Sequence, residues 1–217
     1  MTDVLERFLR YIKIDTQSDD SISDRTPTTE KQWDLARVLE KELKELGLQD
    51  VRLNEQCFLT ACLPANIQKK LPVIGFLAHL DTSHDFSGKD VKAQIIEQYN
   101  GKDIPLKGKA GMQLSPREFP DLLNFEGQTL VTSDGTTLLG ADDKAGVAEI
   151  MAALTHLVDH PEIGHGKIMV AFTPDEETGY GITHFDVKCF GADFAYTVDG
   201  GKLGELEFEN FNASRAF

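Results

Sequence analysis

Acidic residues and one histidine occur at four separate points of the chain, each shortly after a run of mostly apolar residues. These points are His79-Leu-Asp81, Asp142-Asp143, Asp175-Glu176-Glu177 and Asp199. Carboxylates that crowd together repel one another unless a cation offsets their charge. One imidazole with carboxylate oxygens suits zinc, or less selectively manganese or cobalt. If the fold brings the four points together, the sequence therefore predicts a metal site.

The apolar runs that precede these points are typical of buried strands. Residues 72–79 and 166–173 are almost continuously apolar, as expected of central strands covered on both faces, and residues 194–198 form a third run. In open α/β sheets, ligands bind beyond the carboxyl ends of the strands. We therefore expect His79, the Asp175–Glu177 group and Asp199 at one edge of a sheet. Asp81 lies two residues beyond His79, on the same side of an extended chain, where it could orient the imidazole through its second nitrogen.

The segment Gly140–Gly146 leads into an amphipathic helix, expected over residues 144–159. Its apolar face has helical spacing: Val147, Ile150, Met151, Leu154 and Val158. Acids at a helix N-terminus are stabilised by unpaired N–H groups and by the helix dipole, so capping alone is the alternative for this segment by itself. Because the other points share one predicted edge, we expect Asp142 to face the same crevice.

Other patterns complete a predicted α/β fold, with a mixed, mostly parallel sheet and helices on both faces. Helices are expected at residues 3–13 and after a capping box, Thr29 to Gln32, ending at Gly47. Further strands are expected at 51–53, 57–63 and 204–213, and a short helix after Gly181. Residues 15–29 are expected to form a surface loop, and 82–128 to be irregular apart from a strand near 93–99.

The composition narrows the class of protein. A net charge of −14 in 217 residues argues against nucleic acid and against an anionic membrane surface. Three cysteines without zinc-ribbon spacing predict buried thiols rather than a disulfide scaffold. Neither a signal peptide nor a membrane-spanning run is recognisable, so a cytoplasmic location is expected. The remaining histidines are assigned no role, although two of them have i, i+4 spacing: His84, His156, His160, His165 and His184.

The motifs resemble those of the peptidase T family, tripeptide aminopeptidases of the co-catalytic zinc peptidase clan that includes aminoacylases and glutamate carboxypeptidases. The resemblance covers essentially the whole chain. It is carried by Phe-Leu-Ala-His79-Leu-Asp81-Thr-Ser, Leu-Leu-Gly-Ala-Asp142-Asp143-Lys-Ala-Gly, Ala-Phe-Thr-Pro-Asp-Glu176-Glu177 and Tyr-Thr-Val-Asp199-Gly-Gly.

The resemblance implies two zinc ions and a role for each motif residue. His79 and Asp199 would bind one zinc, Glu177 the other, and Asp142 would bridge them. Asp81 would orient His79, and Glu176 would be the general base. The implied substrates are short peptides with a free N-terminus, and a homodimer is implied for the family's complete chain.

Family members are longer than this chain. Residues 1–207 are therefore expected to be the N-terminal portion of the catalytic domain, and 208–217 the start of the crossing into an inserted lid or dimerisation domain. The missing portion would carry a further histidine ligand, so the 217-residue chain alone is expected to be inactive. Alternatives are a dipeptidase or N-acyl amino acid hydrolase of the same clan, or a catalytically silent metal-binding fragment.

Overall fold

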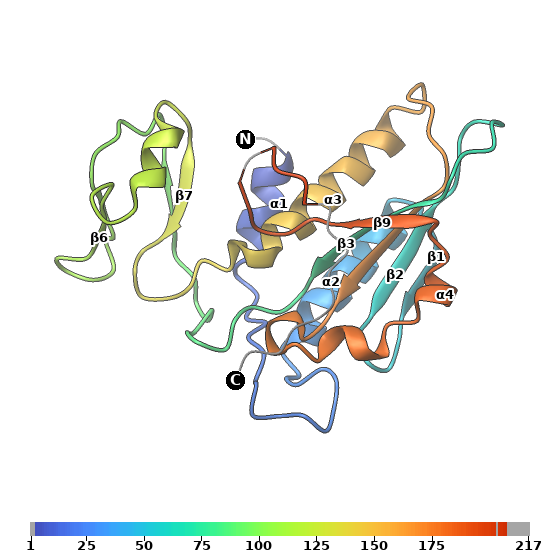
Figure 1. Ribbon diagram of the computed structural model, residues 1–217, viewed down its shortest axis with the longest axis horizontal. Coiled ribbons are helices and arrows are strands. Elements are labelled where there is room, and N and C mark those ends of the chain that lie inside the picture. Colours follow the sequence, from blue (N-terminus) through green and yellow to red (C-terminus); the bar gives the residue numbers. More distant parts are fainter. Residues whose placement is uncertain (1–2, 203, 208–217) are drawn as a thin grey trace.

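A five-stranded mixed sheet forms the centre of the molecule in the computed structural model, which describes residues 3–202 and 204–207 (Figure 1). The strand order is β1-β2-β8-β3-β9. β3 is parallel to β8 and β9, whereas β2 is antiparallel to β1 and β8. The strands are β1 (Gln49–Leu53), β2 (Leu59–Leu63), β3 (Ile74–His79), β8 (Ile168–Thr173) and β9 (Phe194–Thr197). The predicted α/β fold with a mixed sheet is confirmed.

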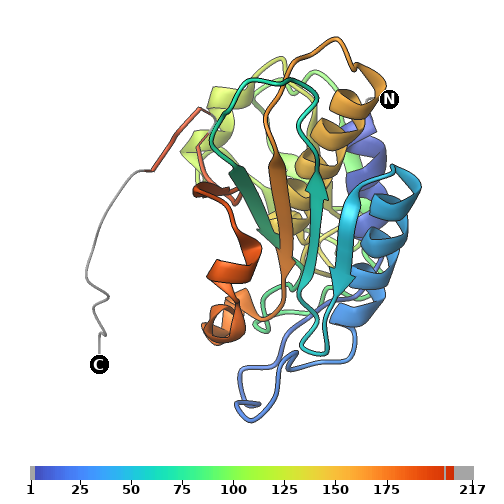
Figure 2. The ribbon, with the colours of Figure 1, turned by 90° about the vertical axis from the view of Figure 1, so that its right-hand side faces the viewer.

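Three helices cover one face of this sheet: α1 (Asp3–Tyr11), α2 (Gln32–Glu45) and α3 (Ala141–Asp159) (Figure 2). Their apolar residues recur at helical spacing and enter one core with alternate residues of the strands. Leu39 of α2 and Met151 of α3 are fully buried there. α3 and β3 are in direct contact, so the core holds the start of α3 against the strand that ends at His79.

The other face carries thinner cover, a 3-10 turn η3 (Gly181–His184) and the short helix α4 (Val187–Phe190). Phe190 packs with Leu77 and Met169 in a second, smaller apolar cluster. Helices on both faces are therefore found as predicted. β9 was expected to be a buried strand, but all four of its residues are exposed, because among the described strands it pairs with β3 alone, at the sheet edge.

Residues 91–134 form a lobe beside the main sheet (Figure 1). It contains two small antiparallel pairs and a 3-10 helix: β4 (Ala93–Ile96) with β7 (Leu130–Ser133), β5 (Ile104–Pro105) with β6 (Gln113–Leu114), and η1 (Pro120–Phe125). The apolar run before Asp142 lies in β7, which pairs with β4 within the lobe and not with the central strands.

Two local predictions about the segment before α2 are wrong. Lys31 occupies the N-cap position of α2 and makes no side-chain cap bond, so Thr29 and Gln32 do not form a capping box. Residues 15–29 are not simply a surface loop, because Thr16 and Thr28 are buried. Their burial follows from contacts with the segments after β3 and β8.

Cys57 and Cys62 are buried free thiols as expected, and Cys189 is exposed. Residues 204–207 carry no strand, and the rest of the strand expected at 204–213 lies outside the described residues, as does the proposed crossing at 208–217. No helix in the described part of the chain is long and apolar enough to cross a membrane.

Candidate metal centre

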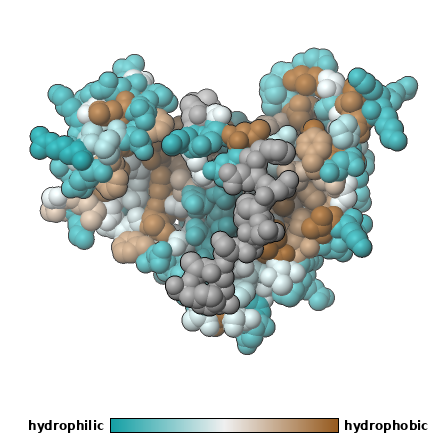
Figure 3. All heavy atoms as spheres, viewed as in Figure 1, coloured by the Kyte–Doolittle hydropathy of each residue, from teal (hydrophilic) through white to brown (hydrophobic). Residues whose placement is uncertain are grey.

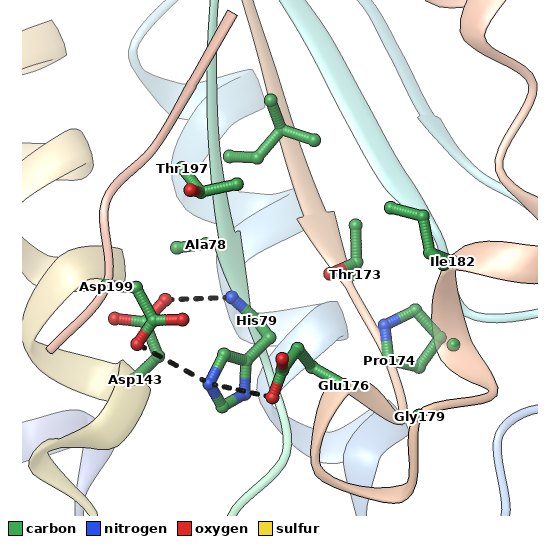
Figure 4. Close-up of a pocket in the computed structure, with 12 residues that line it drawn as sticks. Ala78, His79, Asp143, Thr173, Pro174, Glu176, Gly179, Ile182, Thr197 and Asp199 are labelled. Atoms are coloured by element: carbon green, nitrogen blue, oxygen red, sulfur yellow. Dashed lines mark hydrogen bonds and ion pairs between the residues drawn. The ribbon is translucent and has the colours of Figure 1, made fainter. Parts of the chain in front are cut away.

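His79 lies at the carboxyl end of β3 and is almost fully buried, with 3% exposure. Its Nε2 atom is 2.8 Å from Asp142 Oδ1, 3.8 Å from Glu176 Oε2 and 4.0 Å from Asp199 Oδ1. Figure 4 shows His79 between Glu176 on one side and Asp199 on the other. The structure thus brings all four motifs to one edge of the sheet.

The donor atoms form two overlapping groups in which every pair of atoms is within 4.8 Å. One group joins His79 with Asp142 and Glu177, and the other joins His79 with Asp143 and Asp199. This grouping differs from the expected set of His79, Asp142 and Asp199. Asp142 and Asp199 nevertheless both lie near Nε2 of His79, at 2.8 and 4.0 Å.

The adjacent acids Asp142 and Asp143 have opposite surroundings. The Asp142 side chain is 62% exposed. Asp143 is buried, and its two oxygens accept hydrogen bonds from the backbone N–H groups of His79 (3.0 Å) and Gly146 (3.2 Å). Burial raises the pKa of Asp143 to about 8. Both residues have non-helical backbone angles, and their carboxylates have different partners. Asp143 is held in the structure, while Asp142 is available to a ligand.

Asp81 is fully buried and contacts His79 in two ways. Nδ1 of His79 lies 3.0 Å from the Asp81 carbonyl oxygen and 3.3 Å from its Oδ1. The same carboxylate accepts hydrogen bonds from the backbone N–H groups of Glu176 (3.0 Å) and Glu177 (3.2 Å). Asp81 therefore connects the imidazole to the turn that carries both glutamates, a connection that the His-x-Asp spacing alone did not predict.

Glu176 and Glu177 belong to a short 3-10 turn, η2 (Glu176–Thr178), directly after Asp175. Asp175 has a φ of 56°, and this left-handed residue turns the chain sharply after β8. Glu177 belongs to a donor group with Asp142, whereas Glu176 belongs to neither donor group. Two neighbouring glutamates thus reach the same site with different neighbours.

The charges at this edge depend on one imidazole. Burial alone would lower the pKa of His79, but hydrogen bonds with Asp142 and Asp81 outweigh it and raise the pKa to about 11. The hydrogen bond from His79 lowers the pKa of Asp142. Burial raises the pKa values of Glu176 and Glu177, and the neighbouring carboxylates add to the effect. Several carboxylates thus share one positive charge, and this donor set fits a divalent cation.

A cavity of about 290 Å³ opens beside these acids, between the ends of β3, β8 and β9 and the turn η3 (Figure 4). Its wall is mainly apolar, formed by Leu77, Ala78, Pro174 and Ile182. His79, Glu176 and Asp199 also line it, so the cavity offers both polar and apolar surface to a small ligand. Figure 3 shows mostly hydrophilic surface between the lobe and the main sheet.

Two buried polar groups near the site were missed by sequence reasoning. Asp175 is fully buried and binds Thr28 and Gln32, which precede it by more than 140 residues. Lys144 is buried and donates to the carbonyl oxygen of Ile14 at 2.7 Å, and burial lowers its pKa to about 8. Neither contact leaves a periodic pattern in the sequence.

The other histidines are not members of the donor groups found among the described residues. His156 and His160 lie near the C-terminus of α3, opposite its Asp142 end, with ring centroids 4.3 Å apart. Nδ1 of His160 is 3.0 Å from the Glu162 carboxylate. This pair has the exposed surface location expected from the sequence.

Comparison with solved structures defines the class of fold. The aminopeptidase PepT from Bacillus cereus ATCC 10987 has a TM-score of 0.65 and 24% identity, covering 92% of this chain and 43% of that chain. An M20 family metallo-carboxypeptidase from Sulfolobus solfataricus has a TM-score of 0.56 and 16% identity, and the match covers 93% of this chain and 38% of that chain. The described fold is therefore similar to part of the fold of these two peptidases. No protein-family model matches the chain.

Sequence comparison is more specific. Peptidase T from Desulfitobacterium hafniense (strain DSM 10664 / DCB-2) is 63% identical over 216 residues, 100% of this chain and 52% of that protein. Peptidase T from Geobacillus thermodenitrificans (strain NG80-2) is 59% identical over 214 residues, which are 99% of this chain and 52% of that protein. The chain spans about half the length of the curated relatives it matches. These matches confirm the predicted resemblance to the peptidase T family.

Proposed function

We propose that this chain carries the metal-binding half of an aminopeptidase that removes the N-terminal residue from tripeptides. The observation that carries the proposal is the buried His79, whose Nε2 lies 2.8 Å from the Asp142 carboxylate and whose Nδ1 is held by Asp81. High identity to relatives named peptidase T supports the choice of peptide substrates. The cytoplasmic location and the homodimer stay predictions.

Two zinc ions are the proposed cofactors, with manganese or cobalt as substitutes. His79 and Asp199 would hold one ion, Glu177 the other, and Asp142 would bridge the two. The donor group of His79, Asp142 and Glu177, with Asp142 exposed in it, supports the role of Asp142, while the assignment of Asp199 and Glu177 to separate ions rests on the family resemblance. When bound, two such ions polarise a peptide carbonyl and lower the pKa of water at the site.

Glu176 is the proposed general base. Its Oε2 atom is 3.8 Å from His79 Nε2, and its side chain is 56% exposed, so it can reach both the site and a substrate. It would take a proton from the attacking water and donate it to the leaving amine. The pKa of Glu176 is raised, mainly by burial, and a raised pKa makes the carboxylate a stronger base.

Asp81 is proposed to support this chemistry without touching the substrate. It holds the imidazole of His79 on one side and the backbone of Glu176 and Glu177 on the other. A ligand histidine is commonly oriented in this way through its second nitrogen. The metal ligand and the base are thereby kept in fixed relative positions.

A chimera tests the proposal. The 217 residues replace the matching part of the Desulfitobacterium hafniense peptidase T, and the zinc-loaded product is assayed with tripeptides, dipeptides and N-acyl amino acids. We expect cleavage of tripeptides at a rate comparable to that of the parent, and its loss in a Glu176→Gln chimera. A folded, zinc-loaded chimera that prefers dipeptides or acylated amino acids would contradict the proposal, as would one that cleaves none of the three.

A further inference from the structure

The carboxylate of Asp175 is fully buried, yet it lies next to the two glutamates of the site. Oδ2 accepts a hydrogen bond from the backbone N–H of Thr28 (2.8 Å), and Oδ1 accepts from the Thr28 hydroxyl (2.6 Å). Oδ1 also accepts from Nε2 of Gln32 (2.6 Å), whose Oε1 in turn accepts from the backbone N–H of Asp175 (3.1 Å). Gln32 and Asp175 thus exchange two hydrogen bonds, and Thr28 adds two more.

The turn η2 is therefore held from both sides. Thr28 and Gln32 bind the residue before it, and Asp81 binds the N–H groups of Glu176 and Glu177. Because hydrogen bonds to a buried carboxylate are charge-assisted and short, they restrict the position of the turn more than neutral bonds would. These anchors hold the backbone from which both glutamate side chains extend.

The segment that contains Thr28 also contacts the chain just after Asp81. The backbone N–H of Ser18 donates to the carbonyl oxygen of Thr82 (3.1 Å). The backbone N–H of Thr82 donates to the carbonyl oxygen of Thr16 (3.3 Å). The Thr29 hydroxyl donates to the carbonyl oxygen of Gln17 (2.7 Å), which ties the two ends of the segment together. Residues 16–32 therefore link the turn after β3 to the turn after β8.

We propose that Thr28 and Gln32 are positioning residues, which act through Asp175 to set the location of Glu176 and Glu177 relative to His79. For its effect on metal binding and catalysis, this inference rests on the proposed function. The position of the turn itself does not depend on that function and can be measured separately. The competing explanation is that the contacts stabilise only the segment of residues 16–32.

The variant Gln32→Met removes both hydrogen-bonding groups and keeps a side chain of similar length. Amide hydrogen exchange of the metal-free 217-residue chain reports the turn, because the N–H groups of Glu176 and Glu177 donate to Asp81. We expect their exchange to accelerate by about tenfold or more, while amides in β8 are unchanged. We also expect an altered cobalt(II) absorption spectrum and metal affinity lowered by about 10–100-fold.

A swap of partners provides the rescue test. In Asp175→Asn, the amide nitrogen replaces one of two acceptor oxygens, so it opposes a donor in either orientation, Nε2 of Gln32 or the backbone N–H of Thr28. In the double variant with Gln32→Glu, the glutamate accepts from both the side-chain amide and the backbone N–H of residue 175. The Thr28 hydroxyl can accept a hydrogen bond as well as donate one. We expect the double variant to recover slow exchange at Glu176 and Glu177, whereas each single variant does not.

Tyr11→Phe is the matched control. It removes the hydrogen bond from the Tyr11 hydroxyl to Glu42 (2.6 Å), which lies between α1 and α2 and is not part of the site. We expect reduced stability with an unchanged cobalt spectrum and unchanged exchange at Glu176 and Glu177. If Gln32→Met behaves in the same way as this control, the positioning role is wrong.

The positioning role and the proposed metal site can be contradicted independently of each other. Faster exchange at Glu176 and Glu177 without any metal binding by the unaltered chain would support the positioning role and contradict the proposed metal site. Tight metal binding that is insensitive to Gln32→Met, with unchanged exchange at the turn, would support the metal site and overturn the positioning role.

Discussion

The start of α3 and the turn after β8 use the same device in different settings. Each places a buried aspartate, Asp143 or Asp175, directly beside an acid that reaches the site. The two carboxylate oxygens of Asp143 accept from N–H groups of β3 and α3. The carboxylate oxygens of Asp175 accept hydrogen bonds from Thr28 and Gln32. Thr28 lies in a segment without regular structure, and Gln32 follows that segment. Asp143, the buried neighbour of Asp142, is therefore held by β3 and α3. Asp175, the buried neighbour of Glu176, is held by Thr28 and Gln32, in and just after residues 16–31.

This difference indicates which part of the site can be altered without unfolding the protein. Partners that are backbone groups of a central strand and a helix cannot be exchanged by substitution, so the position of Asp142 depends on the fold itself. The partners of Asp175 include two side chains that can be replaced individually. The glutamate turn is thus the part of the site that substitutions at a distance can move.

The largest effect is expected at the turn after β8. Glu176→Gln in the peptidase T chimera should lower turnover by about 10²–10⁴-fold with zinc content unchanged, because it removes a general base but no proposed ligand. Tripeptide turnover and bound zinc are measured on the same sample. Glu177→Gln is the control, for which zinc is lost as well. Turnover close to that of the parent would remove Glu176 from the mechanism.

A smaller effect is expected for Asp81, which connects the two regions. Two N–H groups and the imidazole of His79 now share the two carboxylate oxygens of Asp81. Asp81→Asn keeps only one of these acceptor oxygens, so His79 is held less firmly in its orientation. Zinc affinity of the 217-residue chain should fall by about 10–100-fold, as measured by calorimetric titration. A zinc-loaded crystal structure in which an Asp81 oxygen binds the metal directly would show that its role is different.

The two buried aspartates should differ in whether they can be rescued. Asp143→Asn leaves one backbone N–H unsatisfied and should lower the free energy of unfolding by about 1–3 kcal/mol. Asp175→Asn should lower it by a similar amount, but Gln32→Glu should restore most of the loss. Urea unfolding of the single and double variants measures both. If Gln32→Glu restores stability to Asp143→Asn equally well, the contrast between the regions is wrong.

The smallest effect is expected at the far end of α3. His156→Gln and His160→Gln change exposed side chains outside the donor groups, so the free energy of unfolding should change by no more than about 0.5 kcal/mol. Zinc affinity should be unchanged, and both quantities are compared with the unaltered chain. A loss of zinc binding in either variant would mean that this histidine pair binds the metal.

The parts of the fold that could be predicted from the sequence are those with continuous or periodic apolar patterns. β3, β8 and α3 were predicted for this reason, and their ends place His79, Glu177 and Asp142 close together. The pattern does not say which sheet a short apolar run joins, and the structure places β7 with β4 in the lobe. It also does not distinguish an exposed edge strand, so β9 was expected to be buried.

Long-range polar contacts were not predictable in the same way. The residues Thr29-Glu-Lys-Gln32 fit the sequence pattern of a capping box, but Gln32 forms a hydrogen bond with Asp175 instead. No local sequence pattern indicates which residues bind Asp175. The choice of Asp142 over Asp143 came from the family resemblance. That choice stays a prediction: both Asp143 oxygens already accept N–H groups, but Asp143 also belongs to one of the two donor groups.

Calorimetric titration of the metal-free 217-residue chain with zinc tests the central claim, that the carboxyl edge of the sheet is a metal site built on His79. Among the described residues, His79, Asp142 and Asp199 are proposed for one ion, but only Asp142 and Glu177 for the other. A zinc centre normally has at least three protein ligands. We predict one tightly bound zinc per chain and its loss in His79→Ala. Two tight sites, or tight binding that survives His79→Ala, would contradict the account.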